Sequence, residues 1–292
     1  MIMLVRRLFS TKATFGGDSS AVYERIFKLG SPVWSSFVDL AVKGCPHSVE
    51  TPRQILDVAS GPGEPGLSIA RRMPDAQVTI TDVEESMMKL AQIRCSGVDN
   101  VKCEVASAIH LSQFADNSFD LVTCNFGLMF FPDQVGALRE MKRVLRPGCE
   151  LLISHWHEMA LPRLSKRILA ACEIDQALPA DPESLAKVGA TEDLLSAAGF
   201  DVAEAVQRTL PFTFTHADNA YEAATLIIRT ILADNHAEEK ARRFFDESII
   251  ISADDSKGSD SSTFLLQNKD DNTLTLHPTS SYIITVAIKP PF

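Results

Sequence analysis

QILDVASGPGEPGLSIARRMPDAQVTITD, residues 54–82, decides the fold, because its pattern predicts a strand, a glycine-rich turn, a helix and a second strand. The turn contains Gly61, Gly63 and Gly66, and the second strand ends on Asp82. Glycine lets the backbone turn sharply and approach a ligand closely, because a Cβ would clash there or forbid the required dihedral angles. An acid at the end of the second strand can accept hydrogen bonds from both ribose hydroxyls. The stretch therefore predicts a site for an adenosine-bearing cofactor.

Two classes of cofactor fit this glycine spacing. The pattern Gly61-x-Gly63-x-x-Gly66 also satisfies the dinucleotide fingerprint of nicotinamide and flavin enzymes. Asp57 precedes the first glycine closely, and a carboxylate there opposes the binding of a pyrophosphate, whereas a cationic or zwitterionic ligand tolerates it. Two later segments also bear on the choice: DNSFDLVTCNFGLMFF at 116–131 and LREMKRVLRPGCELLISHW at 138–156.

With those segments included, residues 55–156 resemble the class I S-adenosylmethionine-dependent methyltransferases, of the small-molecule group called type 11. The resemblance implies an α/β, Rossmann-like methyltransferase fold, with a mostly parallel seven-stranded sheet, helices on both faces and a helical lid. It also implies S-adenosylmethionine as cofactor, a small-molecule methyl acceptor and transfer of the methyl group by in-line attack on the sulfonium.

The cofactor contacts that this resemblance implies are Asp57, Gly61, Gly63, Asp82, Val83, Ser107, Ala108 and Asn125. The first three match the segment around the methionine part of the cofactor, Asp82 matches the ribose-binding acid, and Val83 lies where a side chain can cover the adenine face. The family often has an Asp-Ala pair where Ser107 and Ala108 stand, and a hydroxyl accepts a weaker hydrogen bond than a carboxylate. Asn125 lies where family members close over the sulfonium.

Each of these residues also has a purely structural explanation. Glycines in such a turn can serve packing alone, and Asp82 can cap the next helix, with Glu85 completing a capping box. Chance would have to supply the glycines, the acid, their spacing and the later RVLRPG turn in order, which favours cofactor binding.

Strands and helices are expected to alternate through the chain. The predicted strands of the sheet are 54–59, 77–82, 101–105, 119–125 and 150–156, followed by 202–209 and 282–289. The predicted helices are 134–145, 191–199, 218–233 and 237–246, with a possible hairpin around 268–272. Right-handed crossovers make the first five strands parallel, so their carboxyl ends should gather Asp57, Asp82, Ser107 and Asn125 at one edge.

Four regions are predicted: a disordered transit segment at 1–17, helices over the pocket at 18–50, the S-adenosylmethionine-binding core at 51–160, and the end of the sheet with an inserted helical lid and polar loop at 161–292. MIMLVRRLFSTKATFGG is basic, hydroxyl-rich and free of acids, which predicts a mitochondrial address; a basic terminus by chance would leave the protein cytoplasmic. Tyr23, Phe27 and Trp34 are candidates to line a substrate cavity, with core packing as the alternative. The polar segment DDSKGSD is expected to be a flexible loop.

Composition excludes several classes of partner. The net charge of −10 argues against a nucleic-acid partner, because phosphates demand a basic surface. No run of about 18 apolar residues is present, so we expect no membrane-spanning helix. The six cysteines form no CxxC pair and no ligand-like cluster, so we expect no metal site.

The catalytic residues are left unassigned. His155 and His157, at the end of the fifth strand, are candidates for a general base, with only one expected to face the pocket and His155 preferred; a structural role is the alternative. Two other functions stay open: an NAD(P)-dependent oxidoreductase, and a non-catalytic methyltransferase-like assembly factor. Ser107 and Cys149, which depart from the family pattern, keep the second of these open.

Overall fold

The structure is a computed structural model. It describes residues 31–44, 53–178, 183–226, 228–251, 265–268, 273–276 and 280–291. Two compact units are present. The core unit takes the described residues within Pro32–His157, Glu183–Arg208 and Tyr282–Phe292, and the insert unit takes those within Glu158–Pro182 and Thr209–Ser281.

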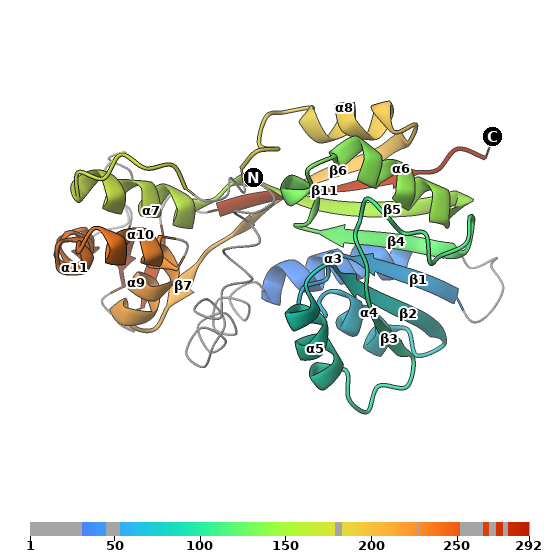
Figure 1. Cartoon of the computed structure of the whole chain (residues 1–292), viewed down its shortest axis with the longest axis horizontal. Coiled ribbons are helices and arrows are strands. Elements are labelled where there is room, and N and C mark those ends of the chain that lie inside the picture. Colours follow the sequence, from blue (N-terminus) through green and yellow to red (C-terminus); the bar gives the residue numbers. More distant parts are fainter. Residues whose placement is uncertain are drawn as a thin grey trace. The chain divides into compact units, whose positions relative to one another are not determined.

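A seven-stranded sheet in the order β3-β2-β1-β4-β5-β11-β6 forms the centre of the core unit (Figure 1). Its strands are β1 Arg53–Val58, β2 Ala76–Asp82, β3 Val101–Val105, β4 Phe119–Asn125, β5 Leu145–Glu158, β6 Asp201–Leu210 and β11 Ser280–Ile288. The first five strands pair in parallel. The N–H of Gly148 donates to the carbonyl of Lys289, and the N–H of Lys289 donates to the carbonyl of Cys149. The end of β11 therefore lies beside the beginning of β5, and the two strands run antiparallel. The predicted fold class is confirmed.

Helices flank this sheet. They are α3 Ser31–Gly44, α4 Gly66–Arg72, α5 Glu85–Arg94, the 3-10 turn η1 Leu128–Phe130, α6 Gln134–Val144 and α8 Ala190–Ala197. α4 packs against β2, α5 against β2 and β3, and α6 against α8. Because helices cover the sheet, the central strand β4 is buried along its whole length, as its apolar run FDLVTCN predicts.

The helix α6 shows how the sequence sets both of its ends. The carboxylate of Asp133 accepts a hydrogen bond from the N–H of Gly136 at 2.8 Å and caps the first turn. Leu138, Met141 and Val144 are buried along one face. Leu145 already has an extended backbone, so the helix ends one residue earlier than predicted and β5 begins five residues earlier.

The insert unit contains four helices and a small second sheet. The helices are α7 Ala160–Ala171, α9 Ala217–Thr225, α10 Arg229–Asp234 and α11 Glu238–Glu247. The sheet has the order β7-β10-β9-β8, with β7 Thr213–Phe214, β8 Ile249–Ile251, β9 Leu265–Gln267 and β10 Leu274–Leu276. β9 and β10 pair antiparallel, as the predicted hairpin requires. Neither α7 nor this sheet was predicted, and the single helix predicted at 218–233 is two helices, α9 and α10.

Several predictions lie outside the described residues: the transit segment at 1–17, the first N-terminal helix with Tyr23 and Phe27, and the polar loop that contains DDSKGSD. The second N-terminal helix is present as α3 and carries Trp34. Within the described ranges, no helix combines the length and the apolar character needed to cross a membrane.

Candidate cofactor site

Asp57 anchors the glycine loop, which we define as residues 59–65 between β1 and α4. Its side chain is completely buried. One carboxylate oxygen, Oδ2, accepts hydrogen bonds from the Ser60 hydroxyl and from the N–H of Gly66, the latter at 2.8 Å. The other, Oδ1, accepts from the Thr123 hydroxyl at 2.6 Å. Asp57 therefore holds the loop from beneath, and its contact with a cofactor stays a prediction.

Asp57 keeps its negative charge at neutral pH despite this burial. Desolvation raises its pKa to about 6, against the opposing effect of the Ser60, Thr123 and Gly66 donors. The carboxylate is therefore mostly ionised at neutral pH, and it places a negative charge directly below the first turn of α4.

The backbone of the glycine loop explains why glycines are needed there. Gly61 and Gly63 have φ of 55° and 107°, a region that side chains disfavour. Ala59 adopts φ of 55° without being glycine, so the loop carries local strain. A Cβ on Gly66 would lie 2.7 Å from Cγ1 of Ile80, so α4 approaches β2 as closely as it does only without a side chain at that position.

Asp82 joins the glycine loop to the beginning of α5. Its carboxylate accepts hydrogen bonds from the N–H of Gly61 and from the N–H of Glu84, both at 2.9 Å. Desolvation raises its pKa, although backbone donors oppose the shift. Glu84, and not Asp82, is the residue that precedes the helix, so the capping box with Glu85 is not the arrangement found. Each oxygen of Asp82 retains acceptor capacity for a ligand.

Val83, Ser107 and Ala108 lie close to Asp82 along the carboxyl edge of the sheet. Val83 follows Asp82 directly and its side chain is 56% exposed, so it is accessible to a ligand. The N–H of Ala106 donates to the carbonyl of Asp82 at 3.0 Å, and this bond brings the following two residues beside the acid. The structure thus places close to Asp82 the three positions that were predicted to contact adenine.

Asn125, at the end of β4, is fixed by β5. The Ser154 hydroxyl donates to its side-chain oxygen Oδ1 at 2.6 Å, and the N–H of Phe126 donates to the Ser154 hydroxyl oxygen at 3.1 Å. With Oδ1 engaged as an acceptor, the amide nitrogen of Asn125 is left as a hydrogen-bond donor at the carboxyl edge.

An aromatic cluster lies next to Asn125. It comprises Trp34, a candidate for the substrate cavity that meets Phe126 edge-on with ring centroids 6.3 Å apart, and Phe126, Trp156 and Tyr282, which the sequence did not single out. The rings of Phe126 and Trp156 stack with centroids 4.3 Å apart and planes 11° apart, and Tyr282 meets both rings edge-on. Phe126 has φ of 54°, which is a strained conformation for a bulky residue. The sequence could have indicated Phe126 by its position, because Phe126 directly follows Asn125, the residue predicted to lie over the sulfonium.

The histidine candidates lie near the end of β5. Residues two apart in a strand share a face, so His155 and His157 point to the same side, and the expectation that only one of them could face a given side was wrong. Trp156, which stacks on Phe126, points to the opposite side. His155 is almost fully buried, its Nδ1 lies 3.3 Å from the carbonyl oxygen of Trp156, and burial lowers its pKa. The structure therefore favours the structural role.

Comparisons with known proteins agree with this geometry. A family model described as "Methyltransferase domain" matches residues 56–153. A demethylmenaquinone methyltransferase of Staphylococcus aureus is 37% identical over 108 residues, which cover 37% of this chain and 44% of the relative. The chain thus aligns with less than half the length of this curated relative.

Solved structures match over a larger part of the chain. The YcgJ protein of Bacillus subtilis has a TM-score of 0.55 and 18% identity, over 88% of this chain and 99% of that one. A putative methyltransferase of Bacillus halodurans has a TM-score of 0.55 and 19% identity, over 88% and 98%. At such identities the likeness concerns the fold. Residues 56–153 of this chain are therefore similar in sequence to methyltransferase domains, and the chain shares the fold of these solved structures.

Proposed function

We propose that the core unit binds S-adenosylmethionine and supports transfer of its methyl group to a small-molecule acceptor. The observation that carries the proposal is the buried Asp57 carboxylate, which occupies the N–H of Gly66 at the start of α4. Dinucleotide enzymes direct such amides at a pyrophosphate. Here the amide is used internally and a negative charge lies beneath it, so the site suits a cationic ligand better than a dinucleotide.

The remaining contacts fit the parts of that cofactor. The free acceptor capacity of Asp82 suits two ribose hydroxyls, exposed Val83 suits the adenine face, and the left-handed glycines allow close approach of the backbone. S-adenosylmethionine supplies a methyl group on a sulfonium that is already a good leaving group. The residues therefore contribute alignment and exclusion of water, an effect worth about 7–11 kcal/mol in well-oriented reactions.

In the transfer itself, a lone pair of the acceptor forms a bond to the methyl carbon as the carbon–sulfur bond breaks. The electrons of the broken bond remain on sulfur. An acceptor that carries a proton must also release it. His155, the candidate base, is buried with a lowered pKa, which favours a structural role, so we expect an acceptor whose proton is lost readily to solvent.

The aromatic cluster supports an apolar, ring-containing acceptor. Phe126 and Trp156 stack next to Asn125, and a planar ring can pack against such aromatic surfaces while the Asn125 amide donates to a ring oxygen. The Staphylococcus aureus relative is named for demethylmenaquinone, a compound of that kind, although the alignment to it covers less than half of its length.

Isothermal titration separates this proposal from a nicotinamide-dependent enzyme. The wild-type chain should bind S-adenosylmethionine and not NAD(P)H, and Asp82→Ala should weaken binding at least about tenfold, because a charge-assisted hydrogen bond is lost. Asp75→Ala, an exposed acid in the turn before β2, is the matched control and should bind as the wild type does. Unchanged affinity in Asp82→Ala would remove Asp82 from the site, and binding of NAD(P)H instead would overturn the proposal.

Turnover separates an enzyme from a cofactor-binding assembly factor. Release of S-adenosylhomocysteine when the protein is supplied with a quinol-containing lipid extract supports catalysis, whereas binding without product in any metabolite extract supports the assembly factor.

We also propose the mitochondrial address, on the basic, acid-free composition of residues 1–17. A fusion of those residues to a fluorescent protein that stayed cytosolic would contradict it.

A further inference from the structure

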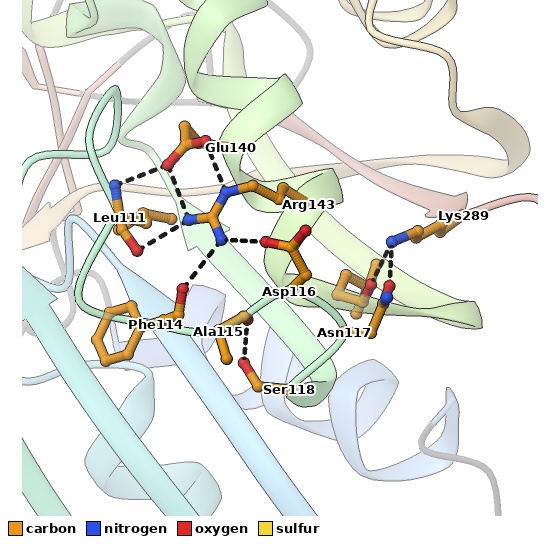
Figure 2. A network of polar contacts seen from close by, with 10 residues as sticks. Leu111, Phe114, Ala115, Asp116, Asn117, Ser118, Glu140, Arg143 and Lys289 are labelled. Atoms are coloured by element: carbon orange, nitrogen blue, oxygen red, sulfur yellow. Dashed lines mark hydrogen bonds and ion pairs between the residues drawn. The ribbon is translucent and has the colours of Figure 1, made fainter.

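A polar clamp on α6 holds the segment that follows β3. We define the clamp as Glu140 and Arg143, and the segment as residues 106–118. The guanidinium of Arg143 donates to both Glu140 oxygens, at 2.8 and 3.0 Å, and this pairing lowers the pKa of Glu140. Figure 2 shows both side chains directed into the segment.

The clamp satisfies both backbone groups of Leu111. The N–H of Leu111 donates to Oε2 of Glu140 at 2.9 Å, and its carbonyl accepts from Nη2 of Arg143 at 2.9 Å (Figure 2). Arg143 also donates from Nη1 to the carbonyl of Phe114 at 2.9 Å and to Asp116 at 2.7 Å. All five N–H donors of the guanidinium are therefore engaged, and a planar fork of this kind cannot be reproduced by lysine.

The clamp holds Leu111, at one end of the short stretch 106–111, and the other end of this stretch lies beside Asp82 at the candidate cofactor site. Ala106 is bonded to the carbonyl of Asp82, and the N–H of His110 donates to the carbonyl of Ser107 at 2.8 Å. Ser107 and Ala108 lie between Ala106, which is held by Asp82, and Leu111, which is held by the clamp, and they belong to no helix and to no strand of more than a single bridge. Their position therefore depends on where Leu111 is held, and side chains of α6 hold it.

We infer that Arg143 is a positioning residue for the adenine end of the cofactor, acting through Leu111 on Ser107 and Ala108. The inference rests on the proposed function. The two arms of the clamp are about one quarter exposed, so neither is needed to fill the core. Each of the bonds to the segment is a charge-assisted bond to a backbone group or an acid, and these are stronger than neutral ones.

The test is adenine selectivity, which a merely structural residue would not change. The wild-type chain and Arg143→Gln are titrated with S-adenosylhomocysteine and with S-inosylhomocysteine, which carries oxygen in place of the adenine amino group. We expect the wild type to prefer the adenine compound about tenfold or more, and Arg143→Gln to lose most of that preference while binding adenine about tenfold more weakly. Arg143→Lys should resemble the Gln variant.

Arg139→Gln is the matched control. Arg139 lies on the same helix and donates to the carbonyl of Ala197, not to the segment, so its selectivity should equal the wild-type value. If Arg143→Gln does not fold, Glu140→Gln should lose selectivity in the same direction. A folded Arg143→Gln or Glu140→Gln with wild-type selectivity, or a wild type that binds but does not prefer adenine, overturns the inference. A wild type that binds neither compound overturns the proposed function itself.

Discussion

Replacing Gly66 by alanine tests whether the contact between α4 and β2 is as tight as the structure shows. The added Cβ would lie 2.7 Å from Cγ1 of Ile80 and 2.9 Å from Oδ2 of Asp57. Real Cβ atoms do not approach other heavy atoms so closely, so α4 must shift. That shift lengthens the 2.8 Å bond from the N–H of Gly66 to Asp57.

Two costs and one gain set the size of the effect. Overpacking of a close-packed contact costs about 1–3 kcal/mol. Weakening a hydrogen bond to a buried carboxylate costs about 1.5–3 kcal/mol if the bond is lost. Alanine is favoured over glycine in a helix by about 0.5–1 kcal/mol. The free energy of unfolding of the core unit should therefore fall by about 2–4 kcal/mol.

Urea unfolding followed by tryptophan fluorescence measures this quantity, because both tryptophans, Trp34 and Trp156, lie in the core unit. Gly97→Ala is the control, since Gly97 has φ of 81° with open space around a Cβ, and its cost of about 1–2 kcal/mol reports backbone strain alone. A Gly66→Ala protein within about 0.5 kcal/mol of the wild type would refute the reasoning.

Two further predictions concern the same loop. Burial raises the pKa of Asp57 from 3.8 to about 6, so the contribution of Asp57 to stability is complete below pH 3.8 and is lost as the pH rises through 6. Between pH 5 and 7, the free energy of unfolding should therefore fall by about 1 kcal/mol because of this group. Asp57→Asn cannot titrate, so its stability should change less over that interval, and equal pH slopes for the two proteins would contradict the assignment. Ala59→Gly should raise the free energy of unfolding by about 1 kcal/mol, because glycine adopts φ of 55° without strain. Thermal unfolding checks this, and a lower midpoint would show that the Ala59 methyl group matters more than the strain.

The sheet could be predicted because its strands carry strong local signals. The apolar runs at β1 and β4, bounded by glycines and polar turns, allow one dominant structure. The predicted bounds of these two strands differ from the observed ones by at most one residue. The insert unit offered no comparable signal. Its strands have two or three residues, too few for an alternating pattern, and α7 carries Pro162 near its start.

The site could be predicted by position but not by direction. Spacing placed Asp57, Asp82 and Asn125 at one edge of the sheet, because parallel strands end together. Spacing does not say where a carboxylate points, and the donors that turn Asp57 inward come from a different strand and from the loop itself. The clamp was missed for the same reason: Arg143 lies on the charged face of an amphipathic helix, where most arginines contact solvent.

The three donors to Asp57 come from β4, from the glycine loop and from α4, so one buried charge ties all three elements together. Lifting the loop would remove the Ser60 hydroxyl from a buried carboxylate, at a cost of about 1.5–3 kcal/mol for a hydrogen bond to a charged group. The loop is therefore expected to stay in place while ligands bind and leave. If the site binds a nucleoside as proposed, that ligand enters and leaves by movement of other segments around the site, and proteins that carry this acid at the same place should share that restriction.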